Sequence, residues 1–501
     1  MKISEIFNLN KKQYELDFID IDIDNEVPLF LDAHIFSWKD DLWSKECNLV
    51  VEDFFRHINE LIRLKKIDEL MNICNNLSEP NETCLGYSNG KPQGSFQKPE
   101  NMMNVFMELY NLNKLNSRLY DVIQTLSDLK FFIKGVKNDT VSDIITNLIR
   151  YQLIIYTQEQ CSLHNIAMTQ RPCKPYWNAI DSKWEKIDCI DQLVVEGRKI
   201  LLVPKGIVFY DRFYPFKVQK FAQHDVLNFL KEEELKIPNS SLIQHRKPKK
   251  SQTVGEPFVT KKDLREREDV DNKEYLLEFC RKYPLIMDEF RKRAEFQSLT
   301  IPQLYEVSDI TLEKDEYNAV IDAFISTLKS IPVGKKGAYE YHDCILGILT
   351  FVFYPSLSNP KKETPIDEKT KRIDICYTNT SGNGFFRNLK TEIVSNYIYV
   401  ECKNYSNDVS NPEYDQLASR FNASSSMVGL LLCRSIKNEE TALKKLSGHY
   451  RRTGGLIIPV TDLNIISMLE LMKIDDLTHI SNHRQEEVLF DLKRKIQVDN
   501  Y

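Results

Sequence analysis

The chain has 501 residues, of which 42% are hydrophobic and 28% are charged, and its formal net charge is −6. This length exceeds that of one ordinary hydrophobic core, so we expect two or three domains. The apolar fraction is typical of a folded chain and excludes global disorder. The acidic balance excludes a uniformly basic coat for nucleic acid. Any such contact must therefore come from local patches or from a metal site.

The cysteines and the apolar runs predict a reducing, membrane-free environment. The 11 cysteines are scattered, and no Cys-x-x-Cys pair occurs, which argues against a structural zinc site and against a disulfide framework. The N-terminus has no apolar core like that of a signal peptide. The longest apolar stretch, 344–354, is too short to span a bilayer. We therefore expect a cytoplasmic protein.

The first 235 residues mix helical and strand patterns. Residues 18–36 alternate apolar and acidic positions around Pro28, which predicts a strand, a turn and a second strand. Apolar residues at helical spacing predict two helices, and a stretch rich in Gly, Pro and Asn between them predicts a loop. After the second helix, an apolar segment with a central turn predicts a pair of strands. These expected elements are helices at 50–75 and 140–160, the loop at 79–95 and the strand pair at 198–210.

A polar break separates this part from the rest. Residues 236–268 contain three prolines and lack apolar periodicity, which is typical of a linker. A charged amphipathic helix is expected at 272–296. We therefore divide the chain into an N-terminal mixed α/β domain (1–235), a polar basic linker with its charged helix (236–300) and a C-terminal domain (301–501).

The last 200 residues have the clearest pattern. Two helices come first, two alternating strands follow, and then a helix, an apolar strand, a helix and a final strand. This order predicts an α/β layer with helices packed on a sheet. The expected helices are 314–330, 336–354, 413–424 and 438–448, and the expected strands are 371–378, 397–404, 427–434 and 455–460.

Charged residues interrupt two of these apolar strands. On strand 397–404, Glu401 and Lys403 are two residues apart and therefore share one face, while Cys402 points the other way. A carboxylate and an ammonium on a buried strand are costly unless a site uses them. Asp374 similarly interrupts the apolar strand 371–378, and Glu340 lies near the start of helix 336–354. Asp/Glu-x-Lys triplets recur elsewhere, so the context carries this inference.

With these pieces in place, residues 310–470 resemble the PD-(D/E)XK superfamily of restriction-endonuclease-like nucleases. The matching motifs are RIDI with Asp374, VECK with Glu401 and Lys403, and the helix YDQLASRF with Gln416 and Arg420 four residues apart. Ile373 takes the place of the usual proline. The resemblance implies a restriction-endonuclease-like core, a central mixed sheet flanked by helices, with Glu340 on its first helix.

The resemblance also implies a set of roles in metal-dependent phosphodiester hydrolysis. Mg²⁺, with Mn²⁺ as a substitute, would be held by Asp374, Glu401 and the backbone carbonyl of Cys402, and Glu340 would ligate directly, through water or at a second ion. Lys403 would position the attacking water and stabilise developing charge. Gln416 and Arg420 would hold the scissile strand or its phosphates.

Structural readings compete with each of these roles. Asp374, Glu401 and Lys403 would alternatively form an ion pair on an exposed strand edge, and Glu340 would be an ordinary exposed acid. Gln416 and Arg420 would equally suit a solvated helix face. The basic linker residues Lys247, Lys249 and Lys250 suit either a solvated linker or a tether for DNA phosphates. The stretch from Gly86 to Lys91 lacks the Gly-Lys-Ser/Thr ending of a phosphate loop and is expected to be a surface loop.

We therefore expect a Mg²⁺-dependent endonuclease whose N-terminal domain recognises substrate, a partner protein or a second copy of the chain. DNA is the favoured substrate because most members of the superfamily resemble DNA enzymes, while the residues leave RNA open. Fold-level analogy suggests bacterial defence against phage or foreign DNA. The alternatives are a DNA repair or recombination nuclease and a catalytically silent module that binds nucleic acid or a partner.

Overall fold

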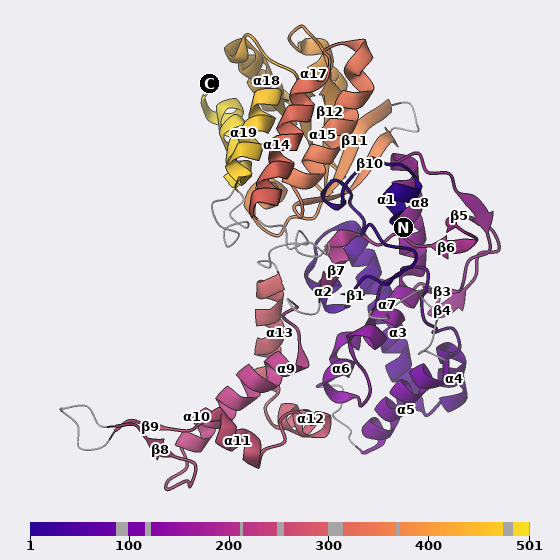
Figure 1. Cartoon of the computed structure of the whole chain (residues 1–501), viewed down its shortest axis with the longest axis vertical. Helices are drawn as coiled ribbons and strands as arrows, with labels where there is room; N and C mark the ends of the chain where they lie inside the picture. Colours follow the sequence, from indigo (N-terminus) through magenta and orange to yellow (C-terminus); the bar gives the residue numbers. More distant parts are fainter. Residues whose placement is uncertain are drawn as a thin grey trace.

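A computed structural model describes residues 1–86, 99–115, 122–210, 214–247, 255–298, 314–366, 371–473 and 484–499. The chain forms two units, each with its own hydrophobic core. The core of the N-terminal unit takes buried side chains from Ile3 through Ala294, and that of the C-terminal unit takes them from Tyr317 through Ile496, together with Leu163. Figure 1 shows the C-terminal unit stacked on one end of the elongated N-terminal unit. The prediction of a mixed α/β chain is confirmed.

The N-terminal unit is mainly helical, with short two- and three-stranded sheets at its margin. Its long helix α3 (Leu42–Leu64) begins at Asp41, whose carboxylate accepts a hydrogen bond from the amide of Ser44 at 2.9 Å. Around it lie α1 (Ile3–Ile6), η1 (Gln13–Glu15), α2 (His34–Trp38), α4 (Ile67–Cys74), α5 (Pro99–Leu115), η3 (Leu126–Asp128), α6 (Leu129–Phe132), α7 (Asn138–Leu148) and α8 (Arg150–Leu163). The strands are β1 (Leu29–Leu31), β2 (Thr169–Arg171), β3 (Tyr176–Asn178), β4 (Lys183–Glu185), β5 (Ile190–Val195), β6 (Arg198–Ile200) and β7 (Val208–Tyr210), with η4 (Lys205–Ile207) before β7.

Several N-terminal elements differ from the sequence-based expectation. The helix expected at 140–160 is two helices, because the backbone turns at Ile149. The helix expected at 50–75 also divides, at Lys65, which has a left-handed backbone with φ of 59°. Within 18–36 the structure contains one strand, β1, and it pairs with the distant β7. Of the loop expected at 79–95, residues 87–95 lie outside the described part of the chain.

The segment expected to link the domains contributes to the first core. It contains β8 (Gln244–His245), β9 (Pro257–Phe258), α11 (Lys261–Arg267), α12 (Lys273–Lys282) and α13 (Pro284–Ser298). Leu264, Leu276 and Phe290 are buried there. The preceding α9 (Val218–Lys220), η5 (Phe221–Val226) and α10 (Leu227–Leu235) lie at the end of the predicted N-terminal domain. The single helix expected at 272–296 is interrupted before Pro284. The hairpin of β8 and β9 projects from the end of the molecule that is farthest from the C-terminal sheet (Figure 1).

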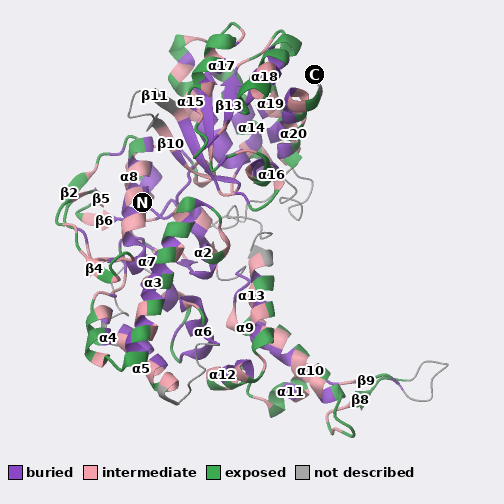
Figure 2. Cartoon of the chain, turned by 180° about the vertical axis from the view of Figure 1, so that it is seen from behind, coloured by how far each residue is buried: buried purple, intermediate pink, exposed green. Residues whose placement is uncertain are grey.

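The C-terminal unit is built on one five-stranded mixed sheet with the order β10-β11-β12-β13-β14. Strands β10, β11 and β12 are antiparallel neighbours, while β12, β13 and β14 run parallel. All six residues of β13 are buried, as expected for a central strand (Figure 2). The strands are β10 (Leu357–Ile366), β11 (Lys371–Asn379), β12 (Tyr397–Lys403), β13 (Val428–Cys433) and β14 (Leu456–Thr461).

Helices cover both faces of this sheet. On one face the hydroxyl of Tyr377 on β11 donates to the carbonyl of Leu346 on α15 (Ala338–Val352) at 3.1 Å. On the other face Gly429 of β13 lies against Leu417 of α17 (Asn411–Ala418). The remaining helices are α14 (Lys314–Ser330), η6 (Lys335–Gly337), α16 (Gly384–Glu392), α18 (Glu439–Thr453), α19 (Asp462–Met472), η8 (Arg484–Glu486), α20 (Glu487–Arg494) and η9 (Lys495–Asp499).

The two units meet along α8, β10 and α15. Helix α8 packs on β10, where Nζ of Lys361 lies 2.5 Å from the carboxylate of Glu159. The N-terminal segment packs on α15, where Nζ of Lys11 donates to the carboxylate of Asp343 at 2.9 Å. The N-terminal unit therefore contacts the helix on which Glu340 lies. None of the helices in the described ranges is long and apolar enough to cross a lipid bilayer.

Candidate active site

The predicted site residues Glu401 and Lys403 lie on β12 and face α17. Tyr399 pairs with Gly429 across the parallel strands, and Gly429 lies against Leu417. Because side chains alternate along a strand, Glu401 and Lys403 share this face with Tyr399, and Val400 and Cys402 take the other. The sequence-based assignment of faces on this strand is therefore confirmed.

Glu401 is a buried carboxylate with two cationic partners. Its side chain is 1% exposed. Nζ of Lys403 donates to Oε1 at 2.7 Å, and the guanidinium of Arg420 donates to Oε2. A lone buried carboxylate would be strongly destabilising, so these two cations compensate its charge where water cannot. Burial lowers the pKa of Arg420, and the charge of Asp374 acts against that shift.

Gln416 joins the same network from α17. Its side-chain oxygen accepts a hydrogen bond of 3.1 Å from Nζ of Lys403. A capping box between Ser410 and Glu413 fixes the start of α17, and the helix ends at Ala418. Arg420 therefore lies just beyond the helix, which is shorter than the expected 413–424. Four predicted site residues, Glu401, Lys403, Gln416 and Arg420, meet in one network.

Asp374 on β11 is tied to the same strand through its backbone. The amide of Cys402 donates to Oδ2 of Asp374 at 2.9 Å. Ile375 of β11 pairs with Val400 of β12, and the strands are antiparallel. The next position in this register places Asp374 opposite Glu401, so the two carboxylates lie on neighbouring strands. The side chain of Asp374 is 24% exposed, and it is therefore the more accessible of the two carboxylates.

A histidine that the sequence did not single out completes the arrangement. Nε2 of His342 on α15 lies 3.7 Å from Oδ2 of Asp374 and 3.4 Å from the carbonyl oxygen of Cys402. Glu340, the residue predicted on this helix, is exposed on the first turn. Residues two positions apart in sequence lie about 200° apart around a helix axis, so the side chains of Glu340 and His342 point in different directions. A single histidine within a helical pattern carried little signal for function.

The donor atoms suit a hard divalent cation in chemistry. Carboxylates of Asp374 and Glu401 and the carbonyl of Cys402 are oxygen ligands of the kind that Mg²⁺ takes. The thiol of Cys402 is buried, which raises its pKa well above the ordinary value and leaves only its backbone for such a role. In the described ranges, however, no three His, Cys, Asp or Glu side chains are gathered closely enough to hold a metal. Glu401 is directed at Lys403 and Arg420, so it must exchange a cationic partner to ligate a metal ion.

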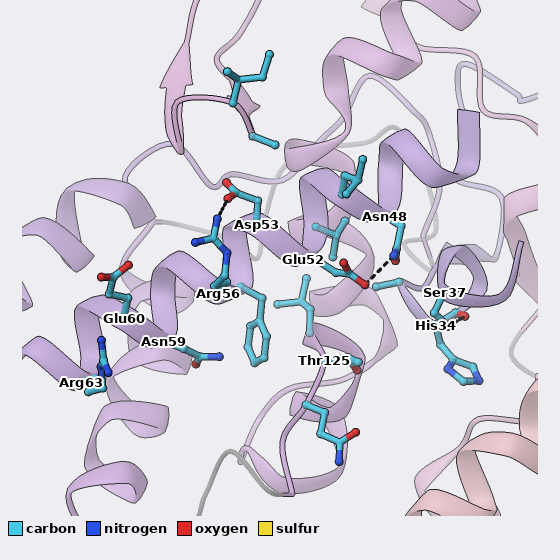
Figure 3. Close-up of a pocket in the computed structure, with 18 residues that line it drawn as sticks. His34, Ser37, Asn48, Glu52, Asp53, Arg56, Asn59, Glu60, Arg63 and Thr125 are labelled. Atoms are coloured by element: carbon cyan, nitrogen blue, oxygen red, sulfur yellow. Dashed lines mark hydrogen bonds and ion pairs between the residues drawn. The ribbon is translucent and has the colours of Figure 1, made fainter. Parts of the chain in front are cut away.

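The remaining predicted residues lie away from this network. Lys247 is exposed beside the β8–β9 hairpin, at the opposite end of the molecule (Figure 1). Lys249 and Lys250 lie outside the described residues. The N-terminal unit has a cavity of about 1010 Å³ along the outer face of α3. Figure 3 shows Glu52, Arg56 and Asn59 on its wall, and none of the predicted site residues line it.

Comparisons with known proteins add two similarities. A family described as "Domain of unknown function (DUF8370)" matches residues 8–214, within the N-terminal unit. The "Putative transposon gamma-delta 80.3 kDa protein" of Escherichia coli (strain K12) is 25% identical over 130 residues, which are 26% of this chain. The match spans 18% of that protein's length. No solved structure matches the chain.

Proposed function

We propose that the C-terminal unit is a metal-dependent nuclease of the PD-(D/E)XK type that hydrolyses phosphodiester bonds in DNA. The observation that carries this proposal is the hydrogen bond from the Cys402 amide to Asp374. It joins the Asp of β11 to the Glu-Cys-Lys triplet of β12. Support also comes from the strand order, in which an antiparallel meander leads into parallel strands behind α15.

In this proposal a bound Mg²⁺ would activate water and neutralise charge on the phosphate oxygens. Asp374, Glu401 and the Cys402 carbonyl would hold it. Lys403 donates to both Glu401 and Gln416, so its ammonium is held in a fixed position, where it would orient the attacking water and stabilise developing negative charge. His342 approaches the same carboxylate and carbonyl oxygens and would orient Asp374 or serve as a further ligand.

DNA is the proposed substrate, and bacterial defence against phage or foreign DNA is the proposed setting. The large N-terminal unit packs on α15, as a unit that senses a trigger would. A DNA repair or recombination nuclease is the alternative within the same chemistry. The relative from Escherichia coli bears the name of a transposon, which is a DNA element. This similarity supports a role on DNA without separating the two settings.

One observation favours a second candidate function. Both oxygens of Glu401 are already paired with Lys403 and Arg420, and a module that binds nucleic acid without cutting it would show the same pairing. This candidate predicts binding with no turnover. The two candidates differ in one outcome: a plasmid incubated with the protein and a divalent cation is cleaved by the nuclease and stays intact with the binding module.

The deciding experiment is cleavage of supercoiled plasmid by the purified full-length protein with Mg²⁺, with Mn²⁺ and with EDTA. We expect nicking or linearisation with either metal and none with EDTA. Lys403→Ala and Asp374→Asn should each abolish cleavage. Lys445→Ala, an exposed lysine on α18, is the matched control and should cut like the natural protein. Full activity of Asp374→Asn would refute the assignment, and plasmid binding without cleavage would favour the silent module.

A further inference from the structure

Exposed aromatic side chains concentrate beside the candidate active site. Among the Phe, Tyr and Trp side chains that the structure describes, only Tyr339, Tyr405 and Phe490 are exposed, at 64%, 46% and 38%. Two of these three lie within three residues of His342 or Lys403. Burying an aromatic ring is favourable, so rings left exposed beside the site offer apolar surface to a ligand.

Tyr339 is connected to the strand that carries Asp374. It lies three residues before His342 on α15, so the two are neighbours along the helix surface. Nζ of Lys362 on β10 lies 4.7 Å from the centroid of the Tyr339 ring. Lys362 pairs with Ile375, the residue after Asp374. A cation and an exposed ring are therefore placed together beside the strand that carries Asp374.

Tyr405 occupies the corresponding place beyond β12. It follows Lys403 by two residues, and Nζ of Lys403 lies 5.9 Å from the centroid of its ring. Its ring is exposed, while Lys403 is 11% exposed and is held by Glu401 and Gln416. A group stacked on Tyr405 would therefore lie close to the proposed catalytic ammonium.

A tethered turn supplies further positive charge. The side-chain amide of Asn404 donates to the carbonyls of Pro332 and Gly334 at 3.0 and 2.9 Å, and the amide of Gly334 donates to the carbonyl of Asn404 at 2.9 Å. These bonds fix the turn before α15 to the residue that follows Lys403. Lys335 and Lys336 are exposed on that turn. The backbone that carries both lysines is therefore tied to the end of β12.

We propose that the strand presented to this site is an unpaired stretch of DNA, whose bases stack on Tyr339 and Tyr405 and whose phosphates lie near Lys335, Lys336 and Lys362. Aromatic rings interleaved with lysines suit single strands, because an unpaired base has a free face for stacking. In a duplex those faces are covered by neighbouring base pairs, so exposed rings add little. This inference rests on the proposed nuclease function and names its substrate class.

The test measures binding separately from cleavage. A labelled DNA single strand of about 20 nucleotides, its duplex and the matching RNA strand are titrated with the full-length protein in Ca²⁺, and fluorescence anisotropy is recorded. We expect the DNA single strand to bind at least about tenfold more tightly than the duplex. Tyr339→Ala and Tyr405→Ala should each weaken this binding by about 5- to 150-fold, the range expected for loss of one stacked base.

Matched variants separate stacking from other effects. Tyr339→Phe and Tyr405→Phe keep the ring and should bind like the natural protein, and so should Phe490→Ala, which removes an exposed ring on α20. Lys335→Glu with Lys336→Glu should weaken binding most at low salt. Thermal unfolding of the tyrosine and lysine variants should change little, because these side chains are exposed, and it would reveal a folding defect. Phe490→Ala also loses the contact of its ring with the buried Phe385, so its stability is measured alongside.

The outcomes distinguish this inference from the proposed function. Metal-dependent plasmid cleavage together with equal binding of single strand and duplex would overturn the inference and leave the nuclease standing. Tighter binding of RNA than of DNA would overturn the assignment of DNA. Single-strand binding that depends on both tyrosines, without cleavage in any divalent metal, would refute the nuclease and, with it, the substrate role. Tighter binding of the DNA single strand, together with its preferential cleavage, supports both the nuclease function and the single-stranded substrate.

Discussion

Nε2 of His342 lies 3.7 Å from Oδ2 of Asp374, and the same nitrogen lies 3.4 Å from the carbonyl oxygen of Cys402. Helix α15 thus approaches two of the proposed metal ligands through a histidine. Glu340, the residue predicted from sequence, is exposed two positions earlier. The contacts favour His342 as the contribution of this helix to the site.

We therefore predict that His342→Ala reduces metal-dependent cleavage more than Glu340→Ala does. Loss of a group that orients or supplements a metal ligand typically lowers metal affinity or activity by about 10- to 100-fold. Initial rates measured over a range of Mg²⁺ concentrations would show whether His342→Ala needs more metal. A larger loss of cleavage in Glu340→Ala than in His342→Ala would instead assign to Glu340 the contribution of α15 to the metal site.

Arg420→Ala should destabilise the fold in a way that a metal ion partly restores. The variant leaves the buried Glu401 with Lys403 as its one remaining cationic partner among the contacts described, and we expect a loss of roughly 2 kcal/mol in the free energy of unfolding. A divalent cation at the site would replace the missing positive charge. Denaturant unfolding in EDTA and in Mg²⁺ should therefore show a smaller gap between the variant and the natural protein in Mg²⁺.

Two further variants make that result specific. Arg451→Ala, on α18, removes an arginine far along the chain from Glu401 and should show no dependence on Mg²⁺. Asp374→Asn combined with Arg420→Ala should lose the restoration, because a proposed metal ligand is then missing. An unchanged gap between Arg420→Ala and the natural protein in both conditions would argue against a metal at Glu401.

Gly429→Val should disturb α17 although valine favours strands. A Cβ atom at this position would lie 2.8 to 3.0 Å from side-chain atoms of Leu417, which is buried. Leu417 must shift, and Gln416 next to it carries the contact to Lys403. We expect a loss of about 1 to 3 kcal/mol in stability together with reduced cleavage.

The matched control for this variant is a helical glycine that has open space beside it. A Cβ atom at Gly448, in the interior of α18, meets no atom within 4 Å. Gly448→Ala should therefore raise stability by about 0.5 to 1 kcal/mol through helix propensity and leave cleavage unchanged. Thermal unfolding and initial rates check both variants. Equal behaviour of the two would show that close approach at Gly429 does not position α17.

Four helices and four strands of the C-terminal unit were predictable because they are strongly periodic, whereas the helices α16, α19 and α20 and one strand were not predicted. Strand β10 was missed, since Pro360, Pro365 and two lysines obscure its pattern. Proline cannot donate to a strand ladder and is tolerated at an edge, and β10 is the edge strand next to β11. The alternation on β12 sufficed to place Glu401 and Lys403. It could not reveal His342, because that contact depends on how α15 lies across the sheet.

The N-terminal unit was harder to predict because its pairings are distant in sequence. Strand β7 pairs with β1, about 180 residues earlier, although a local hairpin with β6 was the natural expectation. Polar residues of this unit are also buried: Asn147 and Arg150 lie in the interior, and Arg150 donates to Glu82 at 2.9 Å. Periodicity does not show which polar residues find buried partners.

The last prediction concerns Asp462, the first residue of α19. Burial raises its pKa from 3.8 to about 6, although Arg434 at 3.1 Å and the hydroxyl of Tyr341 at 2.9 Å favour the charged form. The folded chain therefore holds this proton more tightly than the unfolded chain. Between pH 3.8 and about 6 the stability contributed by this group falls as pH rises, and it stays low above that window.

Asp462→Asn cannot ionise, so its stability relative to the natural protein should rise by roughly 3 kcal/mol across the window. Denaturant unfolding at about pH 4 and about pH 7 measures this difference, and Asp322→Asn, an exposed acid paired with Lys473, is the control that should show little change. A difference that does not vary with pH would mean that Asp462 ionises as readily in the folded chain as in the unfolded one.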